Sequence, residues 1–329
     1  MIYRKLGQSG FDVSALSFGL WQIGDSEYWG ENDTGAQAIH AAIDGGVNLF
    51  DTAEVYGDGD SERVFGKWIG PNRDSVLIAT KVSMSHCGVN DVRKACEGSL
   101  TRLNTDRIDL YQVHWPNHDI PFSETYAELT ALRDEGKIRA IGVSNFGVAD
   151  LGDWLSVGEA ASNQMCYNPL FRAIEIDVLP QCKKHDVGVL TYSPLMQGIL
   201  SGRYSSVEEI PPVRRRTRHF SSNHELVRHG EPGHEELTIN TLRDLKELSD
   251  GAGIQLPDMT TAWILAQPGV ASVIIGSSKP DQVRRSMEAS RLKLPGDITE
   301  RFNEITRPLK EALGPVPDMW VGGENARIR

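Results

Sequence analysis

The sequence predicts an α/β fold, a (β/α)8 TIM barrel with an N-terminal β-hairpin and long loops at the C-terminal mouth. Eight short β-rich apolar runs alternate with segments of helical period, which is the pattern of βαβ units in a parallel sheet. The length of 329 residues suits one barrel of about 250 residues with extensions. Because no linker, repeat or low-complexity tract interrupts the chain, we expect a single domain over residues 1–329, with a core of about 3–310 and a C-terminal tail over 311–329. A doubly wound sheet is the alternative fold.

The elements can be placed in order along the chain. Residues 3–6 and 11–13 predict a hairpin around a turn at 8–10, which would plug the barrel floor. The strands are expected at residues 16–19, 47–51, 76–81, 108–114, 138–144, 162–165, 187–192 and 272–276. Helical period is clearest over residues 34–44, 89–103, 122–135 and 177–185. The stretch 198–237 has little periodicity and follows the seventh strand, so we expect a long loop that overhangs the mouth.

Composition narrows the classes of partner. Lys plus Arg number 34 and Asp plus Glu 45, and this net charge of −11 argues against nucleic acid as a partner. The four cysteines form no C-x-x-C pair and are expected to be reduced thiols. No run approaches the roughly 20 apolar residues of a membrane span, and residues 1–5 lead into a strand rather than a signal-peptide core. We therefore expect a cytoplasmic protein with a small-molecule ligand and no membrane partner.

Three successive strands end on residues that suit acid–base chemistry. The second ends at Asp51, the third at Lys81 and the fourth at His114, and Tyr56 follows Asp51 by five positions. In a barrel of this class the C-terminal strand ends form the active site. Lys81 beside Tyr56 would lower the phenol pKa from about 10, Asp51 would hold Lys81, and His114 would orient a carbonyl oxygen. This set suits general acid catalysis while a nicotinamide cofactor, which no side chain can replace, supplies hydride.

Four segments carry a family resemblance. Residues 45–57 (GGVNLFDTAEVYG), 79–81 (ATK), 102–111 (RLNTDRIDLY) leading to His114, and 136–146 (GKIRAIGVSNF) resemble the aldo-keto reductase superfamily. The resemblance implies a (β/α)8 barrel that binds an extended nicotinamide dinucleotide, normally NADPH, without a Rossmann fold. Consistent with this, the sequence has no G-x-G-x-x-G run. The family's catalytic tetrad corresponds to Asp51, Tyr56, Lys81 and His114, with Tyr56 as proton donor.

The resemblance also implies a cofactor site spread over several loops. The nicotinamide end would contact Trp21, Ser144, Asn145, Gln164 and Tyr192, with the ring stacked on Tyr192. The pyrophosphate would be covered by the segment that holds Ser193, Pro194, Leu195, Gln197, Gly198, Leu200 and Arg203. The adenosine end would contact Gly276, Ser277, Ser278, Lys279, Gln282 and Ser286. Many relatives have arginine in place of Ser278 and asparagine in place of Ser286, so NADP(H) is the prediction and NAD(H) the alternative.

Substrate contacts are expected from aromatic side chains on the loops after the first and fourth strands. Candidates for the pocket wall are Trp21, Tyr28, Trp29 and Trp115. Asp25 and Glu27 add polarity that suits hydroxyl-rich sugars or polyols.

The long loop holds two further patterns. His219, His224, His229 and His234 recur every five residues, but five residues turn a helix by about 140° away from a common face, so we predict no metal site. Arg214, Arg215, Arg216 and Arg218 form either a solvated face or a grip for an anionic substrate. The tail from Gly314 to Arg329 either closes over the mouth or is partly disordered.

The sequence thus predicts an NADP(H)-dependent oxidoreductase that interconverts a carbonyl (an aldehyde, ketone or keto sugar) and the alcohol by hydride transfer. Two alternatives stay open. One is an NAD-dependent sugar or polyol dehydrogenase. The other is a non-catalytic, cofactor-sensing regulatory subunit of the kind associated with channels, which the intact tetrad disfavours.

Overall fold

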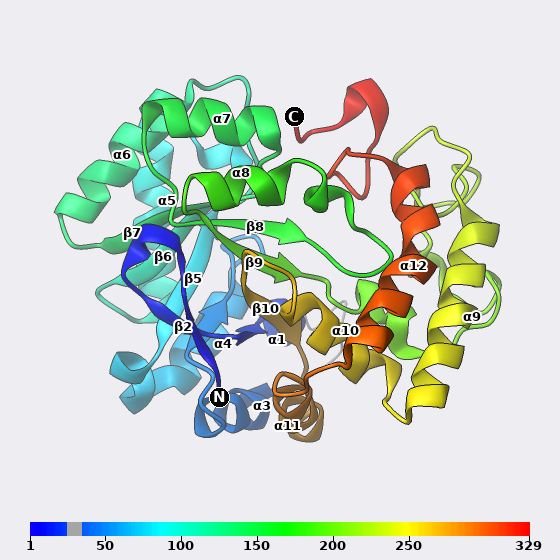
Figure 1. The fold of residues 1–329 in the computed structure, drawn as a ribbon. Helices are drawn as coiled ribbons and strands as arrows, with labels where there is room; N and C mark the ends of the chain where they lie inside the picture. Colours follow the sequence, from blue (N-terminus) through cyan, green and yellow to red (C-terminus); the bar gives the residue numbers. More distant parts are fainter. Residues whose placement is uncertain (25–34) are drawn as a thin grey trace.

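The computed structural model describes residues 1–24 and 35–329 and contains a closed barrel of eight parallel strands (Figure 1). Hydrogen-bonded neighbours follow the order β10-β3-β4-β5-β6-β7-β8-β9, which closes on itself. The strands are β3 (Leu16–Gly19), β4 (Leu49–Asp51), β5 (Leu77–Val82), β6 (Ile108–Val113), β7 (Ile138–Ser144), β8 (Ser162–Cys166), β9 (Gly188–Tyr192) and β10 (Val270–Gly276). The predicted barrel is confirmed, and the doubly wound alternative was wrong. Predicted strand ends differ from these by at most two residues.

Helices surround the barrel (Figure 1). They are α1 (Trp21–Gly24), α3 (Gly35–Asp44), α4 (Asp60–Ile69), α5 (Val89–Leu103), α6 (Phe122–Asp134), α7 (Val148–Val157), α8 (Val178–Lys184), α9 (Glu235–Ala252), α10 (Leu256–Leu265), α11 (Pro280–Ala289) and α12 (Gly296–Leu313). The four helices predicted from period are confirmed to within one residue at each end that the structure describes. Over residues 1–24 and 35–329, no helix is both long and apolar enough to span a bilayer.

An antiparallel hairpin closes the floor of the barrel. Strands β1 (Tyr3–Lys5) and β2 (Asp12–Ser14) pair ahead of the first barrel strand, as predicted. Leu6 and Phe11 pack with the inner residues of the strand starts. At Gly7 the backbone has φ +45°, and an added Cβ would lie 2.5 Å from the Ala161 carbonyl oxygen. The hairpin therefore approaches the barrel too closely there for any larger residue.

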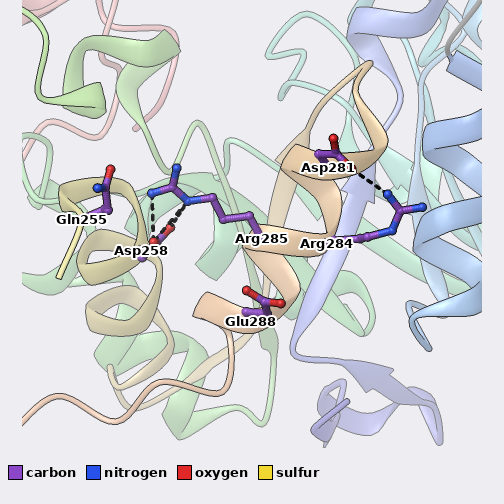
Figure 2. Close-up of a pocket in the computed structure, with 6 residues that line it drawn as sticks. All are labelled: Gln255, Asp258, Asp281, Arg284, Arg285 and Glu288. Atoms are coloured by element: carbon purple, nitrogen blue, oxygen red, sulfur yellow. Dashed lines mark hydrogen bonds and ion pairs between the residues drawn. The ribbon is translucent and has the colours of Figure 1, made fainter.

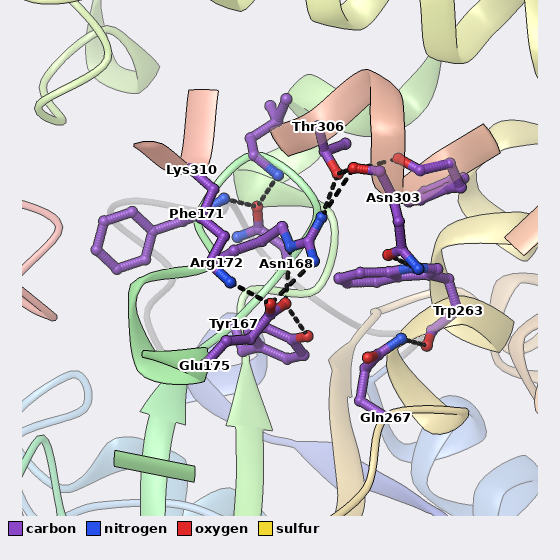
Figure 3. A network of polar contacts seen from close by, with 12 residues as sticks. Tyr167, Asn168, Phe171, Arg172, Glu175, Trp263, Gln267, Asn303, Thr306 and Lys310 are labelled. Atoms are coloured by element: carbon purple, nitrogen blue, oxygen red, sulfur yellow. Dashed lines mark hydrogen bonds and ion pairs between the residues drawn. The ribbon is translucent and has the colours of Figure 1, made fainter. Parts of the chain in front are cut away.

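A buried ion-pair network fixes the loop after β8 to α12 (Figure 3). Arg172 forms a two-point ion pair with Glu175 at 2.7 and 2.9 Å, and Lys310 of α12 donates to the same carboxylate at 2.8 Å. The Arg172 guanidinium also lies over the Trp263 ring at 5.1 Å. Burial raises the pKa of Glu175, but the hydrogen bonds and charges of Arg172 and Lys310 outweigh it and hold that pKa below its usual value. The network holds the outer helices against the loops of the mouth.

The long loop after β9 is tied to the barrel and to the tail. His219 is buried, and its Nε2 lies 2.9 Å from the Leu170 carbonyl oxygen. Arg218 is also buried: it pairs with Glu231 at 3.0 Å, and its Nη2 donates to the Leu313 carbonyl at the end of α12. For Arg218 both interpretations, a solvated face and a grip for an anionic substrate, were wrong, because the side chain is buried and its donors are used inside the protein.

The C-terminal tail is ordered across the top of the molecule. In Figure 1 the red segment runs from α12 back toward α7. The backbone oxygen of Arg329 accepts hydrogen bonds from Ala149 N at 2.9 Å and Asp150 N at 3.1 Å, both in the first turn of α7. The end of the tail is therefore attached to the N-terminus of α7.

Candidate active site

The barrel brings the four tetrad residues of the sequence prediction to one place. Asp51 ends β4, Lys81 lies in β5 and His114 follows β6 directly. The Lys81 side chain is fully buried, and its Nζ donates to Asp51 Oδ1 at 2.7 Å, to the Thr52 carbonyl oxygen at 2.7 Å and to the Tyr56 hydroxyl at 3.2 Å. A buried ammonium group is stable only when it is paired and hydrogen-bonded in this way.

Two rings lie next to the Tyr56 ring. The rings of Tyr56 and His114 meet edge to face with centroids 5.6 Å apart, and the Trp21 ring lies 6.4 Å from that of Tyr56. Lys81 Nζ lies 4.8 Å from the Tyr56 ring centroid. The Tyr56 side chain thus lies next to one cation and one imidazole ring.

The charge states differ from the sequence prediction at one point. Burial raises the pKa of Tyr56 and outweighs the opposing effect of Lys81, so the predicted lowering was wrong for the protein alone. Burial lowers the pKa of Lys81, but Asp51 and Tyr56 outweigh it and the pKa is raised. Burial, reinforced by Lys81, brings the pKa of His114 well below its usual value. At neutral pH Tyr56 therefore carries its proton, Lys81 is charged and His114 is neutral.

Two amides share the second oxygen of Asp51. Gln164 Nε2 donates to Asp51 Oδ2 at 2.7 Å, and Gln112 Nε2 lies 3.4 Å from the same atom. Sequence reasoning missed Gln112. The two-residue period of a strand contained the signal, because Gln112 and His114 alternate onto the same face of the barrel.

The residues predicted at the nicotinamide end form one connected set. Asn145 Nδ2 donates to the His114 carbonyl oxygen at 3.0 Å and to Ser144 Oγ at 3.1 Å. The Tyr192 hydroxyl donates to Asn145 Oδ1 at 2.8 Å, and Ser144 Oγ donates to the Gln164 carbonyl oxygen at 3.1 Å. Asn145 itself has φ +61°, a conformation that non-glycine residues adopt rarely and that clusters at functional sites.

The segment predicted to cover the pyrophosphate has the same unusual backbone. Ser193, Met196 and Gln197 have φ of +53°, +48° and +54°. The segment is not uniformly accessible: Pro194 is buried and Leu200 is fully buried in the core, whereas Leu195 and Gln197 are partly exposed. Leu200 therefore supports the segment from below.

One arginine of the long loop, Arg214, contacts this segment. Arg214 Nη1 lies 3.0 Å from where a Cβ on Gly198 would stand, and it donates to the Tyr204 hydroxyl at 2.8 Å. Within residues 1–24 and 35–329, the buried Nε atoms of Arg215 and Arg216 have no hydrogen-bond partner. The exposed Arg203 guanidinium lies over the Tyr204 ring. Such guanidinium donors suit phosphate oxygens.

The predicted adenosine end lies between β10 and α11. Ser277 Oγ bonds to Gln282 Oε1 at 2.8 Å and accepts from Lys279 N at 3.0 Å, and Ser286 Oγ donates to the Gln282 carbonyl oxygen. The partly exposed Ser278 and the exposed Gly276 and Lys279 lie beside these contacts in the sequence, at the N-terminus of α11. A phosphate at a helix N-terminus is favoured by the backbone N–H groups there.

A separate hollow of about 430 Å³ opens between α10 and α11 (Figure 2). Its cations are paired with carboxylates: Arg285 with Asp258 at 3.0 Å and Arg284 with Asp281 at 2.7 Å. The hollow contains no tetrad residue and lies on the outside of the barrel.

Of the predicted substrate contacts, Trp21 and Trp115 lie near Tyr56 and His114. The centre of the Arg327 guanidinium lies 3.9 Å from the Trp115 ring centroid. Tyr28 and Trp29, with Asp25 and Glu27, fall outside the residues that the structure describes.

Known proteins are similar to this chain over nearly its whole length. The profile of the Aldo/keto reductase family matches residues 15–307. The chain is 32% identical to "Aldo-keto reductase YhdN" of Bacillus subtilis, over 96% of this chain and 97% of that protein. Among solved structures, an aldo-keto reductase from Klebsiella pneumoniae in complex with NADPH has a TM-score of 0.75 at 29% identity, covering 93% of this chain and 96% of that one. The glycerol dehydrogenase AKR11B4 from Gluconobacter oxydans has a TM-score of 0.80 at 29% identity, covering 93% and 95%. This protein belongs to the aldo/keto reductase family.

Proposed function

We propose that the protein is an NADP(H)-dependent oxidoreductase that interconverts a carbonyl compound and the alcohol, with Tyr56 as the proton donor. The observation that carries the proposal is the 3.2 Å contact between the Tyr56 hydroxyl and the buried Lys81 ammonium, which is itself paired with Asp51. The site lies at the C-terminal strand ends, where barrels of this class hold their catalytic residues.

The side chains of this chain fit a nicotinamide dinucleotide. Ser144, Asn145 and Gln164 would hold the carboxamide, and Tyr192 would face the ring. Arg203, exposed on the segment that would cover the pyrophosphate, would offset the phosphate charge. When bound, the reduced cofactor supplies the hydride that no side chain can supply. The Klebsiella relative binds NADPH, and Lys279 with the neighbouring serines supports the phosphorylated form here.

The charge states of these side chains determine which group gives the proton and which groups stabilise the products. The Tyr56 hydroxyl, protonated at neutral pH, gives its proton to the carbonyl oxygen as the carbon is reduced. The Lys81 ammonium at 3.2 Å stabilises the phenolate that remains, and Asp51 keeps Lys81 charged. Neutral His114 keeps one ring N–H as a donor to the same oxygen, which orients the substrate without competing as an acid.

A polyol dehydrogenase is the second candidate, favoured by the 0.80 TM-score to a glycerol dehydrogenase. The reaction is the same one run toward oxidation, so the tetrad assignments do not change. A cytoplasmic location and small-molecule partners stay predictions of the sequence.

The deciding experiment is steady-state turnover of aldehydes, keto sugars and polyols with NADPH, NADP⁺, NADH and NAD⁺. We expect reduction with NADPH to give the highest kcat/KM. Preferential oxidation of polyols with NAD⁺ would favour the dehydrogenase. Tight NADPH binding with no turnover of any compound would refute the enzyme assignment and leave the regulatory subunit.

A further inference from the structure

Arg327 of the tail is held in a fixed position beside the catalytic strand ends. Its Nε and Nη2 donate to the Asp318 carboxylate at 2.9 and 3.0 Å, and its guanidinium plane lies over Trp115 with 3.9 Å to the ring centroid. Trp115 follows His114 directly in the chain. A guanidinium stacked on an aromatic face and gripped along one edge has little freedom to rotate.

This grip leaves the second edge of the guanidinium available. A guanidinium has five N–H donors in a planar fork, and the contacts to Asp318 use the Nε–Nη2 edge. Within residues 1–24 and 35–329, no acceptor bonds to Nη1, and the side chain is 33% exposed. The free edge formed by Nη1 and Nη2 matches the two oxygens of a carboxylate.

The charge of Asp318 does not cancel that of Arg327 completely. Asp318 is fully buried and also accepts from the backbone N–H groups of Trp320 at 2.9 Å, Val321 at 3.2 Å and Arg327 at 3.4 Å. These donors share the carboxylate charge with the tail backbone. Because these backbone donors also stabilise the Asp318 carboxylate, Asp318 orients the Arg327 guanidinium without neutralising its charge completely. The guanidinium can therefore still attract a second anion.

The position of the pair is close to the reacting groups. Arg327 and Asp318 both act electrostatically on the buried hydroxyl of Tyr192, which in turn bonds to Asn145. Asn145 bonds to the His114 carbonyl. Trp115, on which Arg327 lies, directly follows His114 in the chain, so Arg327 lies near the C-terminal end of β6.

We propose that Arg327 determines substrate specificity by binding a carboxylate on the carbonyl substrate, so that the enzyme prefers oxo acids to neutral aldehydes and ketones of the same size. This inference rests on the proposed function and names the substrate class of the same site. Asp318 and Trp115 act as positioning residues for Arg327.

The test compares two matched pairs of substrates with NADPH: 4-oxobutanoate against butanal, and 4-carboxybenzaldehyde against its methyl ester. For at least one pair the wild-type kcat/KM should favour the acid by about 10-fold or more, the size of a charge-assisted hydrogen bond. In Arg327→Gln this ratio should fall toward one through a higher KM for the acid, while the neutral substrates change less than about twofold. Arg329→Gln, which alters a tail arginine that is half exposed and 3.4 Å from Asp150, is the matched control and should keep the ratio.

The outcomes separate the two proposals. A wild-type ratio near one for both pairs, or an equal loss for acid and neutral substrate in Arg327→Gln, would overturn the role of Arg327. Absence of turnover with every substrate would instead count against the proposed function. In that case calorimetry of succinate binding to the NADP⁺-loaded protein still decides, since Arg327→Gln must weaken it about 10-fold. If Arg327→Gln does not fold, Arg327→Lys keeps a charge against Asp318 and should lose most of the acid preference because it lacks the planar fork.

Discussion

Replacing Asp51 by Asn would remove the carboxylate that pairs with the buried Lys81 ammonium. The substitution keeps the shape of the side chain, but the described acceptors that would then face Lys81, among them the Thr52 carbonyl and the Tyr56 hydroxyl, are uncharged. Breaking a buried ion pair by removing one partner costs about 3–5 kcal/mol. The Lys81 side chain is 0% exposed, so the full range applies. Asp51→Asn should therefore lower the free energy of unfolding by about 3–5 kcal/mol at pH 7.

The same change should impair catalysis through Lys81. Without Asp51, burial lowers the pKa of Lys81, and a neutral amine stabilises the Tyr56 phenolate poorly. We expect kcat to fall by at least about 10²-fold. Unfolding in urea without cofactor measures the first effect, and NADPH oxidation measures the second.

Glu62→Gln is the matched control for Asp51→Asn. Glu62 is fully buried and pairs with Arg102 at 2.6 Å, outside the tetrad. Glu62→Gln should also lower the free energy of unfolding by about a few kcal/mol. The folded fraction of this variant should keep the wild-type turnover. The proposed role of the Asp51–Lys81 pair would be refuted if Asp51→Asn had a free energy of unfolding within about 1 kcal/mol of the wild-type value and kept the wild-type kcat.

Two further predictions concern the long loop and the cofactor. Burial lowers the pKa of His219 in the folded protein to about 4. As pH falls, His219 is therefore protonated in the unfolded chain before it is protonated in the folded protein. Between pH 6.5 and 4 this costs about 3 kcal/mol of stability that is fully present above pH 6.5. In urea unfolding across this range, the free energy of unfolding should depend less steeply on pH for His219→Gln than for the wild type. Identical slopes would contradict the lowered pKa of His219. Lys279→Ala should weaken NADPH binding far more than NADH binding in fluorescence titrations, and equal losses would show that Lys279 does not read the 2′-phosphate.

Much of the fold and of the tetrad could be predicted because both depend on local pattern. The alternation of strands and helices is visible in the chain, and the C-terminal strand ends of a barrel must meet at one rim. Asp51, Lys81 and His114 could therefore be placed together before any contact was known. Gln112 was within reach of the same reasoning.

Other features depend on contacts between distant segments. The pKa of Tyr56 is set by the balance between burial and Lys81, and burial is a property of the whole site. The arginines of residues 214–218 look alike in the sequence. Arg218 nevertheless bonds inside the protein, because Glu231 and the Leu313 carbonyl lie within reach of its guanidinium. The position of Arg327 over Trp115 joins residues more than two hundred positions apart. Periodicity carries no signal for such pairings.

The most direct test of the central claim is the turnover of Tyr56→Phe with NADPH. The control is Tyr111→Phe, since the buried Tyr111 hydroxyl has no hydrogen-bond partner in the part of the chain that the structure describes. Tyr111→Phe should keep wild-type turnover. Tyr56→Phe should bind NADPH with nearly unchanged affinity and lose at least about 10²-fold in kcat, as expected when a general acid is removed. Wild-type turnover in Tyr56→Phe would contradict the assignment of Tyr56 as the proton donor.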